Sequence, residues 1–105
     1  HEAIAAAKAG IIGLAQSAAA TYASNNLRVN VVAPGMVNSP LTSSLLSNQL
    51  VLNASKAMHA LGRIGVPEDI AHAIVFLLNP DNSWITGQVI AVDGGLSRVR
   101  PKMKI

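Results

Sequence analysis

Apolar residues recur at helical spacing through the first 26 residues of the chain. Ile4, Ile11 and Ala18 lie seven residues apart, and the stretch is rich in alanine and contains no proline. Residues that recur every three or four positions fall on one face of an α-helix. The pattern therefore predicts an amphipathic helix of about seven turns, at 3.6 residues per turn. The turn cluster Ser24-Asn25-Asn26 ends it.

Two short runs, residues 27–33 and 88–92, are nearly continuous in apolar character and rich in β-branched residues. This composition is typical of parallel strands that are covered on both faces. Glycine-containing turns end both runs, Pro34-Gly35 after the first and Asp93-Gly94-Gly95 after the second. Between them, Pro67 and two acidic residues begin a second helix, which Asn79-Pro80 ends. Its predicted apolar face consists of Ile70, Ala73, Ile74, Leu77 and Leu78.

The order helix, strand, long connection, helix, strand predicts an α/β layered fold with neighbouring parallel strands. Two strands make a poor core, so more sheet is expected than the chain carries. The chain also begins without Met and already inside a helix. Both features favour the interpretation that it is part of a longer polypeptide. The connection 36–61 has a weak helical pattern around 45–58, and such long connections are commonly binding loops or lids.

Composition narrows the possible functions. The chain has 105 residues with 12% charged, and its net charge of +3 comes from the last eight residues, which hold four basic side chains. The remainder carries four basic residues against five acidic ones, a balance of −1. With one Phe, one Tyr and one Trp, the chain lacks the stacking platforms of a nucleic-acid groove, so no nucleic-acid partner is predicted.

Other features argue against membranes and metals. No signal peptide and no apolar run of membrane-spanning length are recognised, so no membrane is expected. The absence of cysteine excludes thiolate metal sites and fits a cytoplasmic setting. His59 and His72 have no partners at metal-ligand spacing, which predicts ordinary surface or partly buried residues and no metal site. Trp84 is predicted to pack in the core or at an interface.

Lys8 lies on the same helical stripe as the isoleucines, an unusual place for a solvated lysine. One interpretation is that its stem packs while its ammonium reaches water. The other is a partly desolvated catalytic or cofactor-binding cation. The residues around Lys8 do not separate the two.

Four motifs resemble the C-terminal portion of a classical short-chain dehydrogenase/reductase. They are Lys8-Ala9-Gly10 with Gly13-Leu14, Leu27 to Asn30 leading to Pro34-Gly35, Arg63 to Ala71, and Ile85 to Gln88 leading to Val92-Asp93-Gly94-Gly95. Each motif is weak alone, but their order makes the resemblance specific. It covers residues 1–97 and leaves 98–105 as a basic tail.

The resemblance implies a doubly wound Rossmann-type parallel sheet whose last strands are 27–33 and 88–93. It also implies hydride transfer between NAD or NADP and a small alcohol or carbonyl substrate. Lys8 then resembles the lysine that binds the nicotinamide ribose and lowers the pKa of a catalytic tyrosine. The resemblance assigns Pro34, Gly35 and Val37 to the segment lining the nicotinamide. Ser39 takes the place of a cofactor-contacting Thr, and 40–60 becomes the substrate-binding loop.

The sequence departs from the family at the catalytic tyrosine. Ile4 stands four residues before Lys8 and has no exchangeable proton, and the chain's one tyrosine lies fourteen residues after Lys8. At 1.5 Å per residue that is about 21 Å along the helix, too far to substitute. His1 lies on roughly the same face as Lys8, and histidine is the commonest general acid/base. His1 is thus either a substitute catalyst or a solvated helix end.

Two hypotheses remain open. The chain belongs either to an active NAD(P)-dependent oxidoreductase or to a non-catalytic relative kept for cofactor binding or assembly. By itself the chain is expected to be inactive, because the glycine-rich phosphate turn and the catalytic serine of the family are not in its sequence. The resemblance also implies a homo-oligomer that pairs through the first helix, whose alanines allow close approach.

Overall fold

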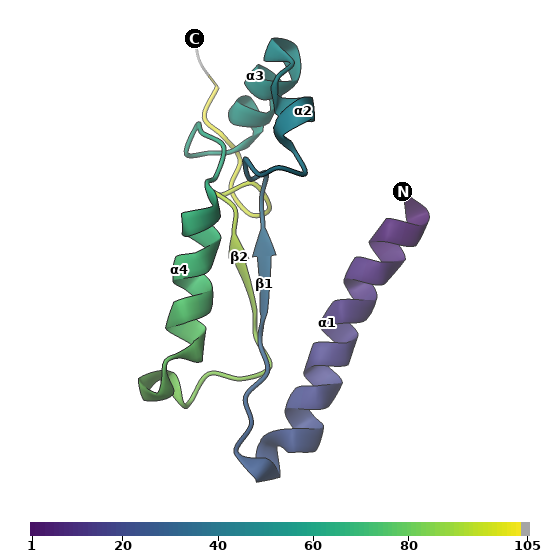
Figure 1. Ribbon diagram of the computed structural model, residues 1–105, viewed down its shortest axis with the longest axis vertical. Coiled ribbons are helices and arrows are strands. Elements are labelled where there is room, and N and C mark those ends of the chain that lie inside the picture. Colours follow the sequence, from purple (N-terminus) through teal and green to yellow (C-terminus); the bar gives the residue numbers. More distant parts are fainter. Residues whose placement is uncertain (104–105) are drawn as a thin grey trace.

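The computed structural model describes residues 1–103 and confirms the predicted order of the main elements (Figure 1). Residues 104 and 105, the end of the predicted basic tail 98–105, lie outside the described residues. The elements in chain order are α1 (Glu2–Tyr22), the 3-10 turn η1 (Ala23–Asn25), β1 (Val31–Pro34), α2 (Ser43–Leu46), α3 (Gln49–Met58), α4 (Pro67–Leu78), the 3-10 turn η2 (Pro80–Asn82) and β2 (Val89–Val92).

The two strands are parallel neighbours, as the sequence predicts. Val31 is paired with Val89 at the start of the sheet and Pro34 with Val92 at its end. Figure 1 shows α4 on one side of the strand pair and α1 on the other, so the chain has three layers. The helices α2 and α3, which form within the connection 36–61, lie beyond the carboxyl ends of both strands. This arrangement is that of a doubly wound α/β sheet.

Both strands are shorter than predicted, because side chains replace the ladder before β1. The Val29 N–H donates to the Thr86 hydroxyl at 3.1 Å, and the Gln88 N–H donates to the Asn30 side-chain oxygen at 3.0 Å. The Asn30 amide in turn donates to the Ile85 carbonyl at 3.0 Å. These bonds satisfy the backbone without strand pairing, so residues 27–30 belong to a connecting segment. Neither strand contains a fully buried residue, which differs from the predicted cover on both faces.

Helix α4 begins at Pro67, as predicted. The Asp69 carboxylate accepts a hydrogen bond from the Val66 N–H at 2.8 Å and so caps the first turn. Of the predicted apolar face, Leu77 is buried at 7% exposure, whereas Leu78 is 72% exposed. The prediction of this face is therefore correct at Leu77 and wrong at Ile74 and Leu78, of which Ile74 is 42% exposed.

The connection 36–61 is more helical than its pattern suggests. Asn48 caps α3, because its side-chain oxygen accepts from the Leu50 and Val51 N–H groups at 3.0 and 3.4 Å. Leu46 of α2 is buried. The predicted helical region 45–58 is thus two helices that meet at Ser47-Asn48.

Helix α1 packs only through its second half. Ala15 and Ala19 are buried, whereas residues 1–11 are all exposed. The stretch Glu2–Asn25 is long and apolar enough to cross a membrane by length and composition, a test that a core helix of a soluble protein also passes. The prediction that no apolar run reaches membrane-spanning length was therefore wrong.

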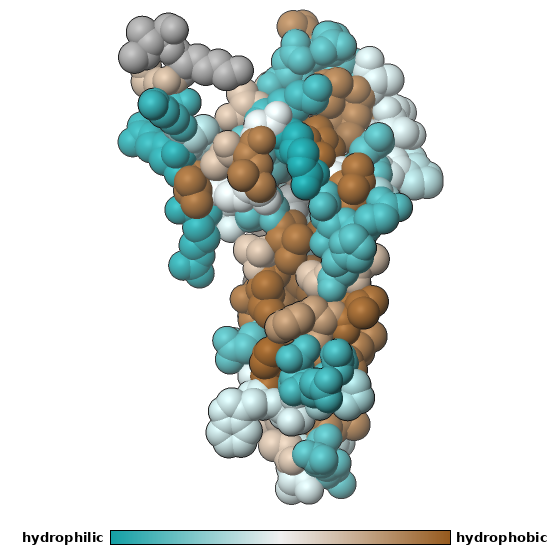
Figure 2. All heavy atoms as spheres, turned by 90° about the vertical axis from the view of Figure 1, so that its left-hand side faces the viewer, coloured by the Kyte–Doolittle hydropathy of each residue, from teal (hydrophilic) through white to brown (hydrophobic). Residues whose placement is uncertain are grey.

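The described residues bury few large side chains. The buried apolar residues are Ala15, Ala19, Leu46 and Leu77, while Trp84 is 97% exposed. Of the two predicted environments of Trp84, core packing is wrong for this chain, and packing at an interface stays a prediction. Figure 2 shows hydrophobic residues gathered on the face that carries α4. The apolar surface there includes Ile74, Val75, Phe76 and Leu78, which are 42%, 65%, 53% and 72% exposed.

Candidate functional site

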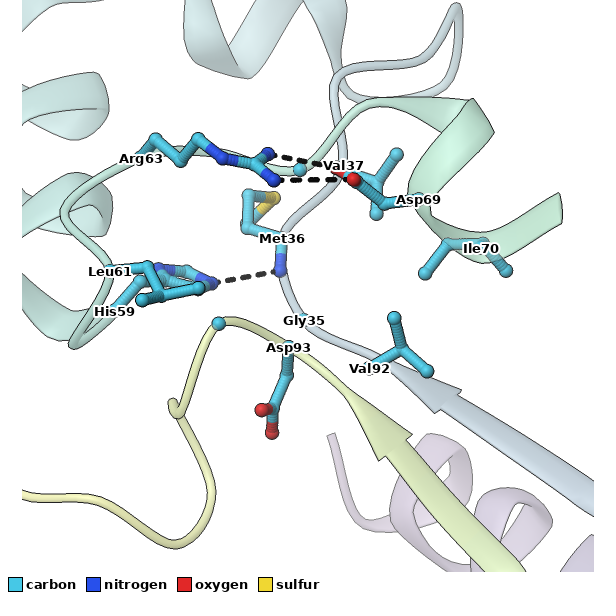
Figure 3. Close-up of a pocket in the computed structure, with 12 residues that line it drawn as sticks. Gly35, Met36, Val37, His59, Leu61, Arg63, Asp69, Ile70, Val92 and Asp93 are labelled. Carbon is cyan, nitrogen blue, oxygen red and sulfur yellow. Dashed lines mark hydrogen bonds and ion pairs between the residues drawn. The ribbon is translucent and has the colours of Figure 1, made fainter. Parts of the chain in front are cut away.

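A cavity of about 160 Å³ lies where the two strands end (Figure 3). Gly35, Met36 and Val37 line it from the segment after β1, and Asp93 and Gly94 line it from the turn after β2. The remaining wall comes from the α3–α4 connection and α4: His59, Leu61, Arg63, Gly65, Asp69 and Ile70, with Val92 at the end of β2. In open α/β sheets, ligands bind outside the carboxyl ends of the strands. The cavity is therefore at the edge where a ligand site is expected.

Gly35 lies in close contact with Asp93 after β2 and with the His59 ring. A Cβ at this position would lie 2.9 Å from the Asp93 Cβ and 2.9 Å from the His59 Nε2. Real Cβ atoms do not approach other heavy atoms so closely. The Gly35 N–H also continues the sheet by donating to the Val92 carbonyl at 3.2 Å. Glycine is required here by the close approach of its neighbours.

His59 is 4% exposed, so the prediction of a surface or partly buried histidine was wrong about its burial. The Met36 N–H donates to its Nε2 at 3.2 Å, and its Nδ1 lies 2.6 Å from the Ser55 carbonyl (Figure 3). A search for metal-ligand spacing does not find such a residue, because both partners are backbone groups. The one usable signal was its position at the end of a predicted helix, before Leu61-Gly62-Arg63.

Arg63 and Asp69 form a two-pronged ion pair beside the cavity. The guanidinium donates to the two carboxylate oxygens at 2.8 and 3.2 Å (Figure 3). Hydrogen bonding from Arg63, and then from the Val66 N–H, lowers the pKa of Asp69 to about 2, and the same contact raises the pKa of Arg63. The pair therefore stays ionised and holds the segment between α3 and α4 against the start of α4.

The segment that carries Pro34, Gly35, Val37 and Ser39 is fixed from two sides. Val37 and Gly65 form a parallel bridge, with the Gly65 N–H donating to the Met36 carbonyl and the Asn38 N–H to the Gly65 carbonyl, both at 2.9 Å. The Thr42 hydroxyl donates to the Val37 carbonyl and accepts from the Ser39 N–H at 3.0 Å. With the Thr42 hydrogen so engaged, the Ser39 hydroxyl, 3.3 Å away, is the donor between the two side chains. Its lone pairs stay available to accept a hydrogen bond.

Asp93 organises the turn after β2. Its carboxylate accepts from the Gly95 and Ser97 N–H groups, both at 3.0 Å. Hydrogen bonding, chiefly from Ser97, lowers the pKa of Asp93, so this side chain carries a charge near neutral pH. In Figure 3 its carboxylate points away from His59 and Met36. Asp93 is a turn-forming residue in this structure.

Lys8 and His1 are both exposed and do not line the cavity. Lys8 is exposed, so the described residues show neither of its two interpretations, a packed stem or a desolvated ammonium, and its role in the site stays a prediction. The N-terminal end of α1 nevertheless points toward the same end of the sheet as the carboxyl ends of the strands (Figure 1). Ile4 is 58% exposed. Pro34, Gly35, Val37 and Ser39 are thus brought together on one segment, and Lys8 and His1 stand apart from them.

These residues suit the nicotinamide end of a dinucleotide but not its pyrophosphate. A glycine-bearing segment at the carboxyl edge, with a free hydroxyl acceptor at Ser39, suits the nicotinamide end. The sequence holds no glycine-rich turn between a strand and a helix for the pyrophosphate. Among residues 1–103, no group of three His, Asp or Glu side chains is placed to hold a metal ion.

Comparison with known proteins agrees with this geometry. Residues 1–97 match a family described as enoyl-(acyl carrier protein) reductase. The chain is 46% identical over 93 residues to the 3-oxoacyl-(acyl-carrier-protein) reductase of Chlamydia trachomatis, covering 89% of this chain and 37% of that protein. The chain thus spans well under half the length of this curated relative.

Two solved structures have the same arrangement. A 4-hydroxyisoleucine dehydrogenase mutant, complexed with NADH and succinate, matches with a TM-score of 0.86 and 32% identity, covering 90% of this chain and 39% of the other. A Beutenbergia cavernae protein described as an NAD(P)-dependent gluconate 5-dehydrogenase, with NADP bound at low occupancy, matches with a TM-score of 0.83 and 36% identity, covering 88% of this chain and 37% of the other. On the sequence match over 1–97 and the Rossmann-type arrangement of α1, β1, α4 and β2, the chain belongs to the short-chain dehydrogenase/reductase family.

Proposed function

We propose that this chain forms the nicotinamide-facing, substrate-loop portion of an NAD(P)-dependent short-chain oxidoreductase. The observation that carries the proposal is the segment Pro34–Ser39, held at the carboxyl edge of the sheet by Gly65, Thr42 and His59. When bound, the nicotinamide supplies or accepts the hydride. Pro34, Gly35 and Val37 line its site, and the Ser39 hydroxyl accepts a hydrogen bond from it. The substrate is a small alcohol or carbonyl compound bound under α2 and α3.

Lys8 has two roles in this proposal. Its ammonium hydrogen-bonds the nicotinamide ribose, and its charge favours the ionised form of an acid/base group nearby. The full-length protein must bring further elements against the exposed half of α1 to enclose it. His1 is the one titratable side chain of the chain on that face toward the start of α1, and we propose it as the substitute proton carrier for the missing tyrosine.

The second candidate function is a non-catalytic relative that binds the cofactor or serves in assembly. Ile4 favours it, because an aliphatic side chain holds no proton at the position where the family has its tyrosine. The exposed alanine-rich half of α1 supports pairing with a second copy through this helix.

For either candidate function, we propose a cytoplasmic homo-oligomer without nucleic-acid or membrane partners. The family match over 1–97 accounts for the apolar length of α1 as a helix of the domain.

The first experiment titrates NADH and NADPH into the full-length protein that carries this chain. Saturable binding of either nucleotide is expected, followed by turnover in a screen of carbonyl substrates. Failure of both nucleotides to bind removes the oxidoreductase proposal. Binding without turnover of any substrate supports the second candidate.

The next experiment restores the missing phenol. Ile4→Tyr is expected to raise turnover by about a hundredfold, the lower range for a positioned general acid/base. Ile11→Tyr, two turns along the same face of α1, is the matched control and should leave turnover unchanged. His1→Ala should lower the wild-type rate if His1 carries the proton. Unchanged turnover in His1→Ala rejects that role.

A further inference from the structure

His59 is the one buried polar or charged residue among residues 1–103. It stands at the C-terminal end of α3, one turn after Ser55, and reaches from the substrate-loop helix to the segment after β1. Burial by itself demands a hydrogen-bond partner for each ring nitrogen, so the informative observation is which groups supply the partners. Here both are bonded, and to two different parts of the site.

The two bonds fix the state of the ring. The Met36 N–H can only donate, so Nε2 must offer a lone pair. The Ser55 carbonyl can only accept, so Nδ1 must carry the hydrogen. The ring is therefore neutral with its proton on Nδ1. Any other protonation state breaks one of the two contacts.

The Met36 N–H is the amide that follows Gly35, and the His59 ring lies against the Gly35 Cα, where an added Cβ would be 2.9 Å from Nε2. The backbone at Gly35–Val37 therefore cannot move without moving His59. Since the Nδ1 hydrogen bond anchors the same ring to α3, a shift of α3 also reaches Met36. The substrate loop and the nicotinamide-facing segment are joined through one side chain.

We propose that His59 is a positioning residue that sets the Gly35–Val37 segment and couples it to α3. This inference rests on the proposed function for its effect on nucleotide binding. The coupling itself can be measured without any ligand.

Two substitutions separate the two ring nitrogens. His59→Gln keeps an acceptor near the place of Nε2, whereas His59→Asn keeps a donor near the place of Nδ1 and leaves the Met36 N–H without an acceptor. Both variants are smaller than histidine, neutral and polar, and they differ by one methylene. A role in packing alone therefore predicts somewhat different losses of overall stability, but no selective effect at the Met36 amide. His72→Asn, at an exposed position on α4, is the matched control.

The first readout is hydrogen exchange at the Met36 amide of the full-length protein that carries this chain. His59→Asn is expected to accelerate exchange about tenfold, because the Met36 N–H then has no acceptor. His59→Gln should stay within about threefold of wild type, and His72→Asn should match it. Equal acceleration in the Gln and Asn variants, or none in either, overturns the proposal.

The second readout is the dissociation constant for NADH and NADPH. His59→Asn should weaken binding about tenfold while His59→Gln binds nearly as wild type does, on the same acceptor argument. If the Asn variant binds the nucleotides as tightly as wild type, the claim that the Met36 hydrogen bond affects nucleotide binding is wrong. If wild type binds neither nucleotide but the exchange pattern holds, the proposed function fails and the coupling of α3 to Met36 stands.

A third measurement needs no variant. The nitrogen chemical shifts of the wild-type His59 ring should show an unprotonated Nε2 and a protonated Nδ1. The opposite tautomer overturns the proposal even if the Asn variant does not fold.

Discussion

Arg63 and Asp69 fasten the segment that leads from α3 into α4. The same carboxylate caps α4 through the Val66 N–H and pairs with Arg63, so one residue serves both the helix and the cavity wall. Its two partners each stabilise the ionised form, which is why its pKa lies near 2 rather than near its ordinary value. The sequence alone predicted that Asp69, at the third position of α4, would complement the helix dipole. It did not predict the ion pair with Arg63, because the turn at Gly65 brings the two residues together only in the folded chain.

The lowered pKa of Asp69 predicts a pH dependence of stability. A carboxyl whose folded pKa is depressed contributes stability above its unfolded pKa and loses it as pH falls through the folded pKa. The unfolding free energy should therefore decrease between about pH 4 and about pH 2. Asp69→Asn should be less stable at neutral pH and should show a flatter profile in this window. Urea unfolding of the full-length protein that carries this chain, at a series of pH values, measures both the stability and its pH dependence.

Glu68→Gln provides the control for that experiment, since Glu68 lies in the same helical turn and forms no ion pair among the described residues. It should leave the slope between pH 4 and pH 2 close to that of wild type. A slope equally flattened by both substitutions would assign the effect to general helix charge and not to the Arg63 pair.

At the scale of elements, periodicity and turn residues were enough for α1, α4 and the parallel pair β1–β2. The bounds of β1 could not be foreseen, because the Asn30 and Thr86 side chains replace the ladder only when their segments lie side by side. The candidate site was half predictable. Pro34, Gly35, Val37 and Ser39 follow a strand end and resemble a family motif, whereas His59 acts through backbone partners that no spacing rule marks.

Arg28 fixes the far end of α4 to the loop before β2. Its guanidinium donates to the Leu77 carbonyl at 2.7 Å and to the Ile85 carbonyl at 3.0 Å. The first is one of the carbonyls that a helix end leaves without an internal partner, and the positive charge also complements the helix dipole. Arg28→Met should lower the unfolding free energy by about 1–3 kcal/mol, because the Leu77 carbonyl loses its donor and the Ile85 carbonyl keeps only the Asn30 amide.

Chemical denaturation of the full-length protein measures this change. Arg100→Met is the control, at an exposed position with no side-chain hydrogen bond among the described residues, and should stay within about 0.5 kcal/mol of wild type. Equal losses in the two variants would mean that Arg28 acts through net charge alone. Arg28→Lys should recover only part of the loss, because an ammonium does not span both carbonyls with a planar fork.

At the scale of the whole molecule, the chain is too open to be stable by itself. Its accessible surface is 8039 Å², whereas a folded monomer of 10.8 kDa is expected to expose about 5,500 Å². Its radius of gyration is 16.1 Å, against about 13 Å for a compact domain of this length. The excess lies on the first half of α1, on the outer face of α4 and along the strands. In the curated relatives, more than half of the protein lies outside the matched portion.

The isolated 105-residue chain is therefore expected to lack a cooperative thermal transition. Burial of a few small or medium side chains cannot offset a backbone ordering cost of about 1–2 kcal/mol per residue. Calorimetry should show no peak near the 60–80 kcal/mol that is typical of about 100 folded residues. Mixing with the N-terminal portion of the full-length protein should restore both a transition and protection of the strand amides, because the missing layers then cover α1 and both strands. A sharp transition in the isolated chain would contradict this expectation, since it would show that the strand pair and the four helices α1 to α4 are sufficient for cooperative folding.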